Sequence, residues 1–281
     1  SKIYNTALIK IARQIDTWVD GVSDPVCTEV RNLGARQDFP RPIVVFNPLS
    51  FDIDMPVRVY HPSEKVTDCD GNDVLFQNVR SSRSNDSHLD TLFMAKVPAM
   101  GYATYWLSFE AETPEQKSAL TCGDGDVIFM ENDLIRVEFT KESGGIAKLV
   151  DKASGIEYAN LAVPTVIDDH ETDTWAHNVF KFHNIKGLMD VKSIELVEQG
   201  PLRASVRIKY TFNTSTLTQE FCLTEGKKVI RVKCKANWSE QFTMLKIPFN
   251  IGGTDAISTY EIPCGYIKRP CNGEEEPTQQ W

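Results

Sequence analysis

Two segments of this sequence combine residue types that could do chemistry, and the first runs from Asp168 to His183. It reads DDHETDTWAHNVFKFH and holds four carboxylates, three histidines and Trp175. Aspartate oxygens and histidine nitrogens are common ligands of divalent metals. Alternatively, Trp175 offers a flat apolar face to a sugar ring, while Asp173 and His177 hydrogen-bond the sugar hydroxyls. The histidine spacing matches no standard metal motif, so the residues alone favour a third interpretation, a solvated loop.

The second segment is the acidic triplet Glu274, Glu275 and Glu276, which lies between Gly273 and Pro277. Adjacent carboxylates repel one another and shift one another's pKa values, and acid–base catalysis can use such shifts. Most acidic triplets are nonetheless solvated turns. On residue types alone, this segment too is better explained as a solvated loop than as a catalytic site.

Composition limits the classes of protein that the chain can form. With 281 residues and 41% apolar content, it can bury one large core or two smaller ones. Its net charge of −9 and the lack of any Lys/Arg run argue against a nucleic-acid partner. No apolar run reaches the roughly 18 residues of a membrane span, and no charged-then-apolar leader precedes the first predicted helix. We therefore expect neither nucleic-acid nor membrane binding.

The seven cysteines indicate the redox environment of the protein. They are scattered and include no Cys-x-x-Cys pair of the kind found in zinc or thioredoxin-like sites. Such cysteines are typical of free thiols in a reducing compartment. The cysteine pattern therefore predicts a cytoplasmic location and no metal site built on cysteines.

A helical pattern occupies residues 2–20. Apolar residues from Ile3 to Trp18 recur at spacings of three and four, which predicts an amphipathic helix ending near Gly21. Its broad apolar face predicts packing against other helices or, without them, a homodimer contact. Residues 23–40 contain prolines and a glycine but no periodicity, which predicts a linker.

Strand patterns fill the rest of the chain. Residues 41–110 alternate in short runs such as Val57–Tyr60, which predicts a small antiparallel β-sandwich. The polar, proline-containing stretch 111–126 predicts a second linker. From 127 to 281, runs such as Leu202–Phe212 approach or exceed ten residues, and strands of that length favour a large two-sheet sandwich over a small barrel.

Several motifs, in order along the chain, carry a specific resemblance. They are FNPLSF (Phe46–Phe51), MENDLIRVEF (Met130–Phe139), GGIAKLVDKASGIEY (Gly144–Tyr158), DTWAH (Asp173–His177) and YEIPCGYIKRPCNGEEEPTQQW (Tyr260–Trp281). Together they resemble the bacterial α-mannosidases of glycoside hydrolase family 38, and the resemblance runs over nearly the whole chain.

The resemblance implies a mainly β architecture. Chains of this family begin with a catalytic α/β barrel, which is followed by a helix bundle, a small β-domain and a galactose-mutarotase-like super-β-sandwich. By resemblance, residues 1–22 are the terminal helix of the bundle, 41–110 the small β-domain, and 127–281 the first part of the super-β-sandwich. Residues 23–40 and 111–126 are then the linkers.

The ends of the chain predict that it is cut from a longer parent enzyme, because it starts at Ser1 rather than Met and ends on the bulky Trp281. The super-β-sandwich is then truncated at its C-terminus. By resemblance, the parent hydrolyses α-mannosides with retention, using an Asp nucleophile and a zinc ion held by Asp/His pairs. Those motifs belong upstream of Ser1, so we assign no catalytic or zinc-binding residue here and expect this chain alone to be inactive.

The role that the resemblance implies is a scaffold whose polar loops reach the rim of the substrate cleft. Its expected partners are the missing barrel and helix bundle and, in the parent, an α-mannoside or another carbohydrate. The candidate substrate-side residues are Asp173, Trp175, His177, Glu274, Glu275 and Glu276. The family pattern has Gly where Ala176 and Asn178 flank His177, and a Cβ at those positions alters how closely the loop approaches a sugar.

Two alternatives from other classes stay open. One is a self-sufficient carbohydrate-binding β-sandwich module, which would place Trp175 on a sugar ring. The other is a metal-stabilised interaction domain, whose ligands would be Asp169, His170, Asp173 and His177.

Overall fold

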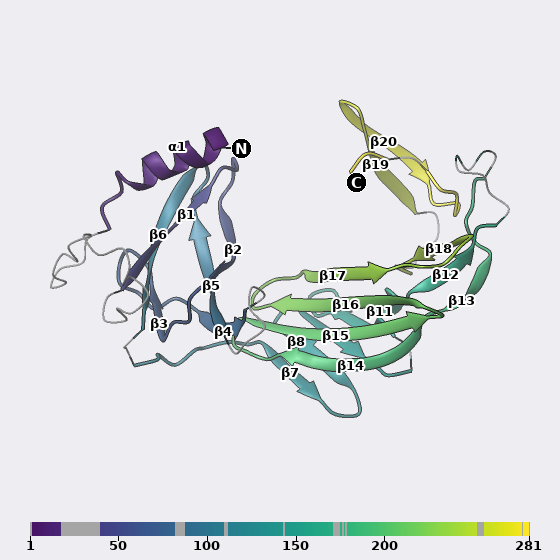
Figure 1. Cartoon of the computed structure of the whole chain (residues 1–281), viewed down its shortest axis with the longest axis horizontal. Helices are drawn as coiled ribbons and strands as arrows, with labels where there is room; N and C mark the ends of the chain where they lie inside the picture. Colours follow the sequence, from purple (N-terminus) through teal and green to yellow (C-terminus); the bar gives the residue numbers. More distant parts are fainter. Residues whose placement is uncertain are drawn as a thin grey trace. The chain divides into compact units, whose positions relative to one another are not determined.

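The computed structural model describes residues 2–17, 40–81, 88–109, 112–142, 144–170, 175, 177, 179–251, 256–276 and 278–280. Within these residues the chain forms one helix and the strands β1 to β20 (Figure 1). The prediction of a mainly β fold is confirmed. The chain divides into two compact units, Ser1–Ser118 with Gly200–Arg203, and Ala119–Gln199 with Ala204–Trp281. The division after Ser118 falls inside the stretch 111–126.

Helix α1 (Lys2–Ala12) is shorter than the sequence predicts: the expected helix over 2–20 is wrong for residues 13–17, and residues 18–20 lie outside the described part. The next amides bond to carbonyls three residues back, with distances of 2.9 Å from Gln14 N to Ile11 O and 3.2 Å from Ile15 N to Ala12 O. Such bonds tighten and end a helix. No residue of α1 is buried, so tertiary packing does not extend it. The predicted linker residues up to 39 lie outside the described part.

The first unit contains a sandwich of two three-stranded antiparallel sheets. One sheet has the order β1 (Arg41–Asn47), β6 (Gly101–Ser108), β3 (Lys65–Thr67), and the other the order β2 (Ile53–Val59), β5 (Leu89–Val97), β4 (Phe76–Arg80). Val66, Phe93 and Leu107 are fully buried in its core. In β5, Phe93, Ala95 and Val97 alternate into this core, whereas Leu92 belongs to a separate buried cluster with Leu202.

A buried asparagine explains the FNPLSF motif. The Asn47 side chain donates to the carbonyl oxygens of Phe51 at 2.8 Å, Pro98 at 3.0 Å and Val97 at 3.3 Å, and it accepts a bond from Leu49 N at 3.0 Å. Buried backbone groups need such partners. Asn47 therefore holds the turn that follows β1.

One short segment from later in the sequence, Gly200–Arg203, belongs to the first unit. The buried Gln77 accepts bonds from Leu202 N at 2.9 Å and Arg203 N at 2.8 Å, and donates to Arg203 O at 3.2 Å. A Cβ on Gly200 would lie 2.3 Å from the Gln77 amide oxygen. Only glycine leaves room for this side chain.

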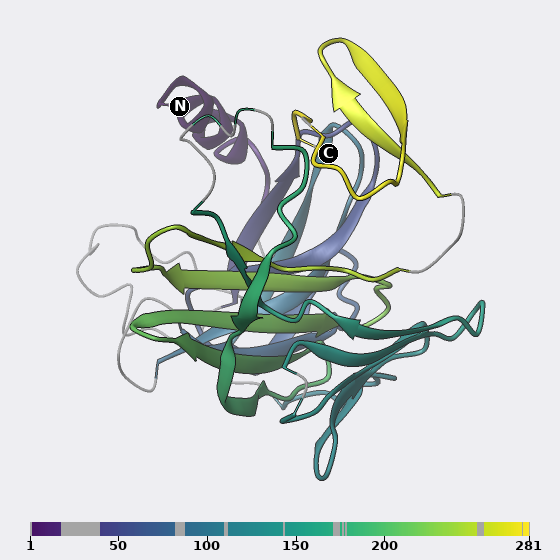
Figure 2. The same ribbon diagram turned by 90° about the vertical axis from the view of Figure 1, so that its right-hand side faces the viewer.

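The second unit is built on two larger antiparallel sheets. The five-stranded sheet has the order β11 (Glu157–Leu161), β10 (Ile146–Asp151), β9 (Ile135–Phe139), β8 (Ile128–Glu131), β7 (Thr121–Asp124). The four-stranded sheet has the order β14 (Asp190–Glu198), β15 (Arg203–Phe212), β16 (Ser215–Thr224), β17 (Ile230–Asn237). Figures 1 and 2 show these sheets as neighbouring layers, and one buried apolar cluster with Phe139 and Phe221 fills the space between them.

Two smaller sheets complete this unit. A three-stranded sheet has the order β13 (Ile185–Leu188), β12 (Thr165–Asp168), β18 (Thr243–Lys246), and β19 (Ile257–Ile262) pairs with β20 (Gly265–Pro270) as a hairpin. The linker prediction for 111–126 is wrong at β7, where polar residues gain backbone partners from β8. Strands this short show too little alternation to be recognised.

Two further motifs have a structural explanation in this unit. In MENDLIRVEF, the buried Asn132 donates to Thr224 O at 3.1 Å and Lys227 O at 2.9 Å, and accepts bonds from Leu134 N and Ile135 N. In GGIAKLVDKASGIEY, Gly145 has a φ of 71° and donates its N–H to the buried Tyr210 hydroxyl at 2.9 Å.

Candidate functional site

The first polar loop connects two neighbouring strands. It leaves β12 at Asp168 and returns to β13 at Ile185, and these strands pair with a bulge between Val166 and Ile167. The described ends of the loop are held by backbone bonds from Asp168 N to Asn184 O at 2.8 Å and from Asp169 N to Phe242 O at 2.9 Å. The small sheet therefore fixes both ends of this loop.

The predicted substrate-side residues of this loop are exposed where the structure describes them. The Trp175 side chain is 80% exposed, and His177 is also exposed. Asp173 lies outside the described residues, as do the flanking Ala176 and Asn178. Trp175 is thus presented at the surface and contributes nothing to the core.

The three carboxylates of the second loop do not act as a cluster. Glu274 accepts a bond from the Asn272 side chain at 2.9 Å, Glu275 pairs with Lys246, and Glu276 pairs with Arg269 at 3.2 Å. Each carboxylate has a different partner. Retaining glycoside hydrolysis needs two carboxyl groups about 5 Å apart across the bond, and this triplet is arranged instead as three separate polar contacts.

The two polar loops meet at Lys246 of β18. Its ammonium group donates to Phe182 O at 2.9 Å in the first loop and to the Glu275 carboxylate in the second. The Glu275 backbone N–H also donates to Phe180 O at 2.8 Å. The structure therefore joins the two segments that the sequence singled out separately.

A cavity of about 580 Å³ lies beside this junction. Its lining includes Asn160, Phe182, His183, Lys246 and Asn250. Amide, imidazole and ammonium groups beside an aromatic ring can hydrogen-bond hydroxyl groups and cover an apolar surface. This volume is in the range of small-molecule sites.

The residues that the structure describes do not form a metal site. They contain no group of three or more His, Cys, Asp or Glu side chains that could hold an ion. Of the four residues proposed as ligands, His170 lies 2.7 Å from Asp168 through its Nδ1, and Asp173 is outside the described range. The described residues therefore do not fit the zinc ion of the family chemistry.

Sequence reasoning missed Lys246 and the junction that it makes. β18 has four residues, and its pairing with β12 joins positions about 80 residues apart, such as Thr165 and Lys246. A lone lysine at the end of a short, mostly apolar run gives no local signal of its role. The fold alone reveals that Lys246 faces both loops.

Solved structures share this fold. An α-mannosidase from Enterococcus faecalis V583 superposes with a TM-score of 0.68 over 96% of this chain, at 14% sequence identity. A glycosyl hydrolase family 38 protein from Enterococcus faecalis gives a TM-score of 0.61 over 82% of this chain, also at 14% identity. At this identity the similarity shows the fold of the chain.

Sequence comparison gives the family. Residues 130–281 match the glycosyl hydrolases family 38 C-terminal domain. This chain belongs to glycoside hydrolase family 38, and the predicted family resemblance is confirmed.

Curated relatives carry α-mannosidase names. The chain is 28% identical to human alpha-mannosidase 2C1 over 190 residues and 27% identical to the lysosomal alpha-mannosidase of Dictyostelium discoideum over 134 residues. These alignments cover 64% and 41% of this chain. The chain spans 18% of the first relative, 13% of the second, and 36% of the Enterococcus faecalis V583 enzyme.

Within the described residues, no helix has the length and apolar character needed to cross a membrane.

Proposed function

We propose that this chain is the non-catalytic β-portion of a retaining, zinc-dependent α-mannosidase, and that it supports the catalytic barrel and lines the substrate cleft. The α-mannosidase names of its relatives support the reaction class. The observation that carries the cleft-lining role is the junction at Lys246, which joins the loop bearing Trp175 to the loop bearing Glu275. Zinc would supply Lewis-acid chemistry to the parent from residues outside this chain.

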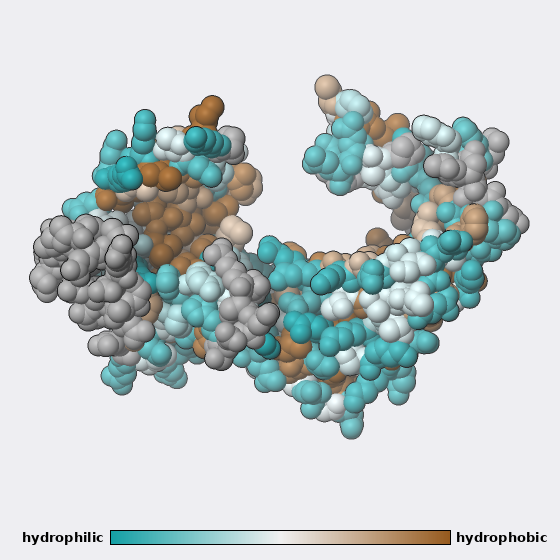
Figure 3. All heavy atoms as spheres, viewed as in Figure 1, coloured by the Kyte–Doolittle hydropathy of each residue, from teal (hydrophilic) through white to brown (hydrophobic). Residues whose placement is uncertain are grey.

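The surface of the first unit supports a scaffolding role. Figure 3 shows apolar side chains gathered over the strands of this unit. Phe51 is 60% exposed and Met100 is 74% exposed, and both lie at the end of the unit where Asn47 holds the turn. Exposed apolar surface of this kind is typical of protein contacts. The missing barrel and helix bundle would cover it in the parent, and a second copy through α1 is the alternative partner.

The cysteines support a cytoplasmic location for the enzyme. The six described cysteines are all free thiols. Four of them, Cys69, Cys234, Cys264 and Cys271, are exposed, and free exposed thiols are typical of a reducing compartment.

An assay of the purified chain tests the proposal. The chain should not hydrolyse aryl α-mannosides with or without added zinc, because we place the nucleophile and the zinc ligands outside it. The control is the longer enzyme, in which the same assay should show turnover. Turnover that follows this chain through purification and responds to metal would overturn the proposal.

The exposure of Trp175 favours a second candidate, a carbohydrate-binding module that works without a barrel. An aromatic ring that is 80% exposed is suited to cover a sugar face. Titration with methyl α-mannoside separates the two functions. In a carbohydrate-binding module, the bound sugar should quench the fluorescence of Trp175. A scaffold should leave the emission unchanged.

A further inference from the structure

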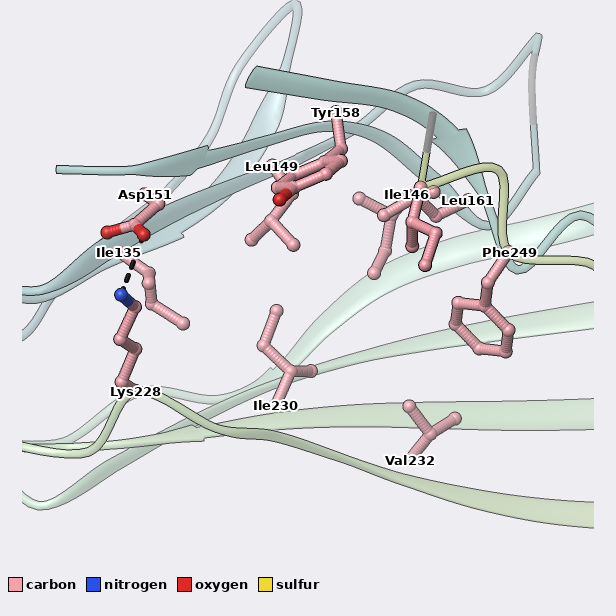
Figure 4. A pocket seen from close by; sticks show the side chains of 11 residues that line it. Ile135, Ile146, Leu149, Asp151, Tyr158, Leu161, Lys228, Ile230, Val232 and Phe249 are labelled. Carbon is pink, nitrogen blue, oxygen red and sulfur yellow. Dashed lines mark hydrogen bonds and ion pairs between the residues drawn. The ribbon is translucent and has the colours of Figure 1, made fainter. Parts of the chain in front are cut away.

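An apolar cleft opens along one side of the sandwich in the second unit. It lies between β10 and β11 of one sheet and β17 of the other, and its volume is about 370 Å³ (Figure 4). The side chains that form its walls include Leu149, Tyr158, Leu161, Ile230, Val232 and Phe249. Phe249 is 56% exposed and Ile251, also on the cleft, is 70% exposed. The two sheets therefore leave apolar surface uncovered at this side.

The cleft is bordered by a free strand edge. In the described sheet order, β17 is the last strand of the four-stranded sheet and pairs with β16 alone. An edge strand presents backbone N–H and C=O groups to any further strand. Figure 4 shows Ile230 and Val232 of β17 pointing into the cleft. A strand added beside β17 would place its own side chains over the same opening.

The other face of β17 is basic. Arg231, Lys233 and Lys235 alternate with the cleft residues, so they project from the opposite face of the sheet. All three are exposed. Lys233 lies 3.9 Å from Glu220, and within the described part of the chain no ion pair engages Arg231 or Lys235. The edge therefore combines an apolar row on one side with a positive row on the other.

An ion pair closes one end of the cleft. Lys228 lies 2.6 Å from Asp151, and this pair connects the turn before β17 to the end of β10. Ser154 Oγ also donates to Asp151 at 2.8 Å. Phe249 lies toward the other end of the cleft (Figure 4).

From this geometry we propose that the cleft is the docking site of an extended polypeptide segment from outside these 281 residues, with apolar and acidic residues alternating along it. The segment pairs with the free edge of β17. Its apolar side chains fill the cleft beside Ile230 and Val232, and its acidic side chains face Arg231 and Lys235. Opposite charges on neighbouring strands stabilise such a pair. This site differs from the Lys246 junction and does not depend on the proposed function.

Three labelled octapeptides test the proposal by fluorescence anisotropy: EVEIEVEL, its non-alternating rearrangement EEVVEEIL, and the basic KVKIKVKL. The first should bind at least about tenfold more tightly than either of the others, because it alone matches both rows of β17. Amide exchange of β17 should slow when it binds. Equal binding of all three peptides, or no binding of EVEIEVEL at about 1 mM, would overturn the proposal. The lysines of β17 would then be explained as charges that prevent pairing of this edge strand.

Variants locate the site. Val232→Asp should weaken EVEIEVEL binding at least about tenfold, since it puts a charge into the cleft. Val229→Asp is the matched control, because Val229 is 68% exposed and does not line the cleft, and it should leave binding unchanged. Urea unfolding of both variants checks that they fold.

A charge exchange tests the basic row without changing the cleft. Arg231→Glu with Lys235→Glu should reverse the preference, so that KVKIKVKL binds more tightly than EVEIEVEL. An unchanged preference would contradict the assigned orientation.

Sedimentation tests whether a second copy of the chain fills the cleft instead. Self-association that Val232→Asp abolishes would show that it does, and this result would also overturn the proposal.

Discussion

The turn at Asn132 and the loop bearing Trp175 both lie in motifs that resemble the family, yet they differ in burial. Asn132 is 1% exposed, and its side chain bonds to four backbone groups of two turns. Trp175 is 80% exposed. A buried motif of this kind is explained by the folding of the chain. Burial does not explain an exposed aromatic motif in this way, and the proposed function assigns that motif to binding.

This comparison predicts that changes at buried motif positions act on stability and that changes at exposed ones act on activity. Gly145 should show the largest effect on stability. A Cβ there would lie 2.6 Å from Leu161 O and 2.7 Å from Ala162 O, at a φ of 71°. Crowding against backbone and a left-handed conformation each cost roughly 1–3 kcal/mol, so Gly145→Ala should lower the free energy of unfolding by about 4 kcal/mol.

Gly155→Ala is the matched control for this change. Gly155 has a similar φ of 70°, but nothing lies within 4 Å of its added Cβ. Urea unfolding should therefore show a loss of only about 1 kcal/mol, the conformational part alone. Equal losses in the two variants would show that crowding at Gly145 has no effect.

Asn132→Ala should be the next most destabilising change. It removes the partners of Leu134 N, Ile135 N and Thr224 O, and buried polar groups without partners cost about 1–3 kcal/mol. We expect a loss of about 3 kcal/mol in urea unfolding. Asn272→Ala is the control, because Asn272 holds the exposed turn at Glu274 and should cost under about 1 kcal/mol.

The sequence predicts one part of the fold much better than another. The strand run expected over Leu202–Phe212 is observed as β15, Arg203–Phe212, because it is long enough to be recognised. The strands β12 and β18 have four residues each and pair far along the chain, so no local pattern marks them. Of the candidate site, the two polar loops are visible in the sequence, but their meeting at Lys246 depends on those short strands.

The ion pair beside the cleft gives a pH-dependent prediction of smaller size. A hydrogen bond from Lys228 lowers the pKa of Asp151 from 3.8 to about 2, with further bonds from Ser154 and Ala153 N. Because the folded pKa is depressed, the stabilisation is present above pH 3.8 and is lost as the pH falls through about 2. Asp151→Asn should therefore lose less stability than the wild type over this range.

Urea midpoints measured at several pH values check this difference. Glu157→Gln is the control, because Glu157 is in an exposed ion pair with Lys148 at 2.8 Å elsewhere on the same sheet, and should follow the wild-type curve. Parallel curves for the wild type and Asp151→Asn would mean that the pair does not stabilise the fold.

The smallest effect on stability should come from the exposed loop, where the comparison predicts the clearest effect on function. Truncating an exposed side chain changes the free energy of unfolding by at most about 0.5 kcal/mol, whereas truncating a buried Trp costs about 3–5 kcal/mol. In the longer enzyme, Trp175→Ala and His177→Ala should therefore keep the melting temperature and lower kcat/KM, because both side chains are presented at the surface. Phe242→Ala is the matched control, since this residue is 66% exposed in the same unit and outside the two polar loops. A large fall in melting temperature with unchanged kcat/KM would assign Trp175 to packing against another part of the enzyme, and the loop would then belong with the Asn132 turn as a structural motif.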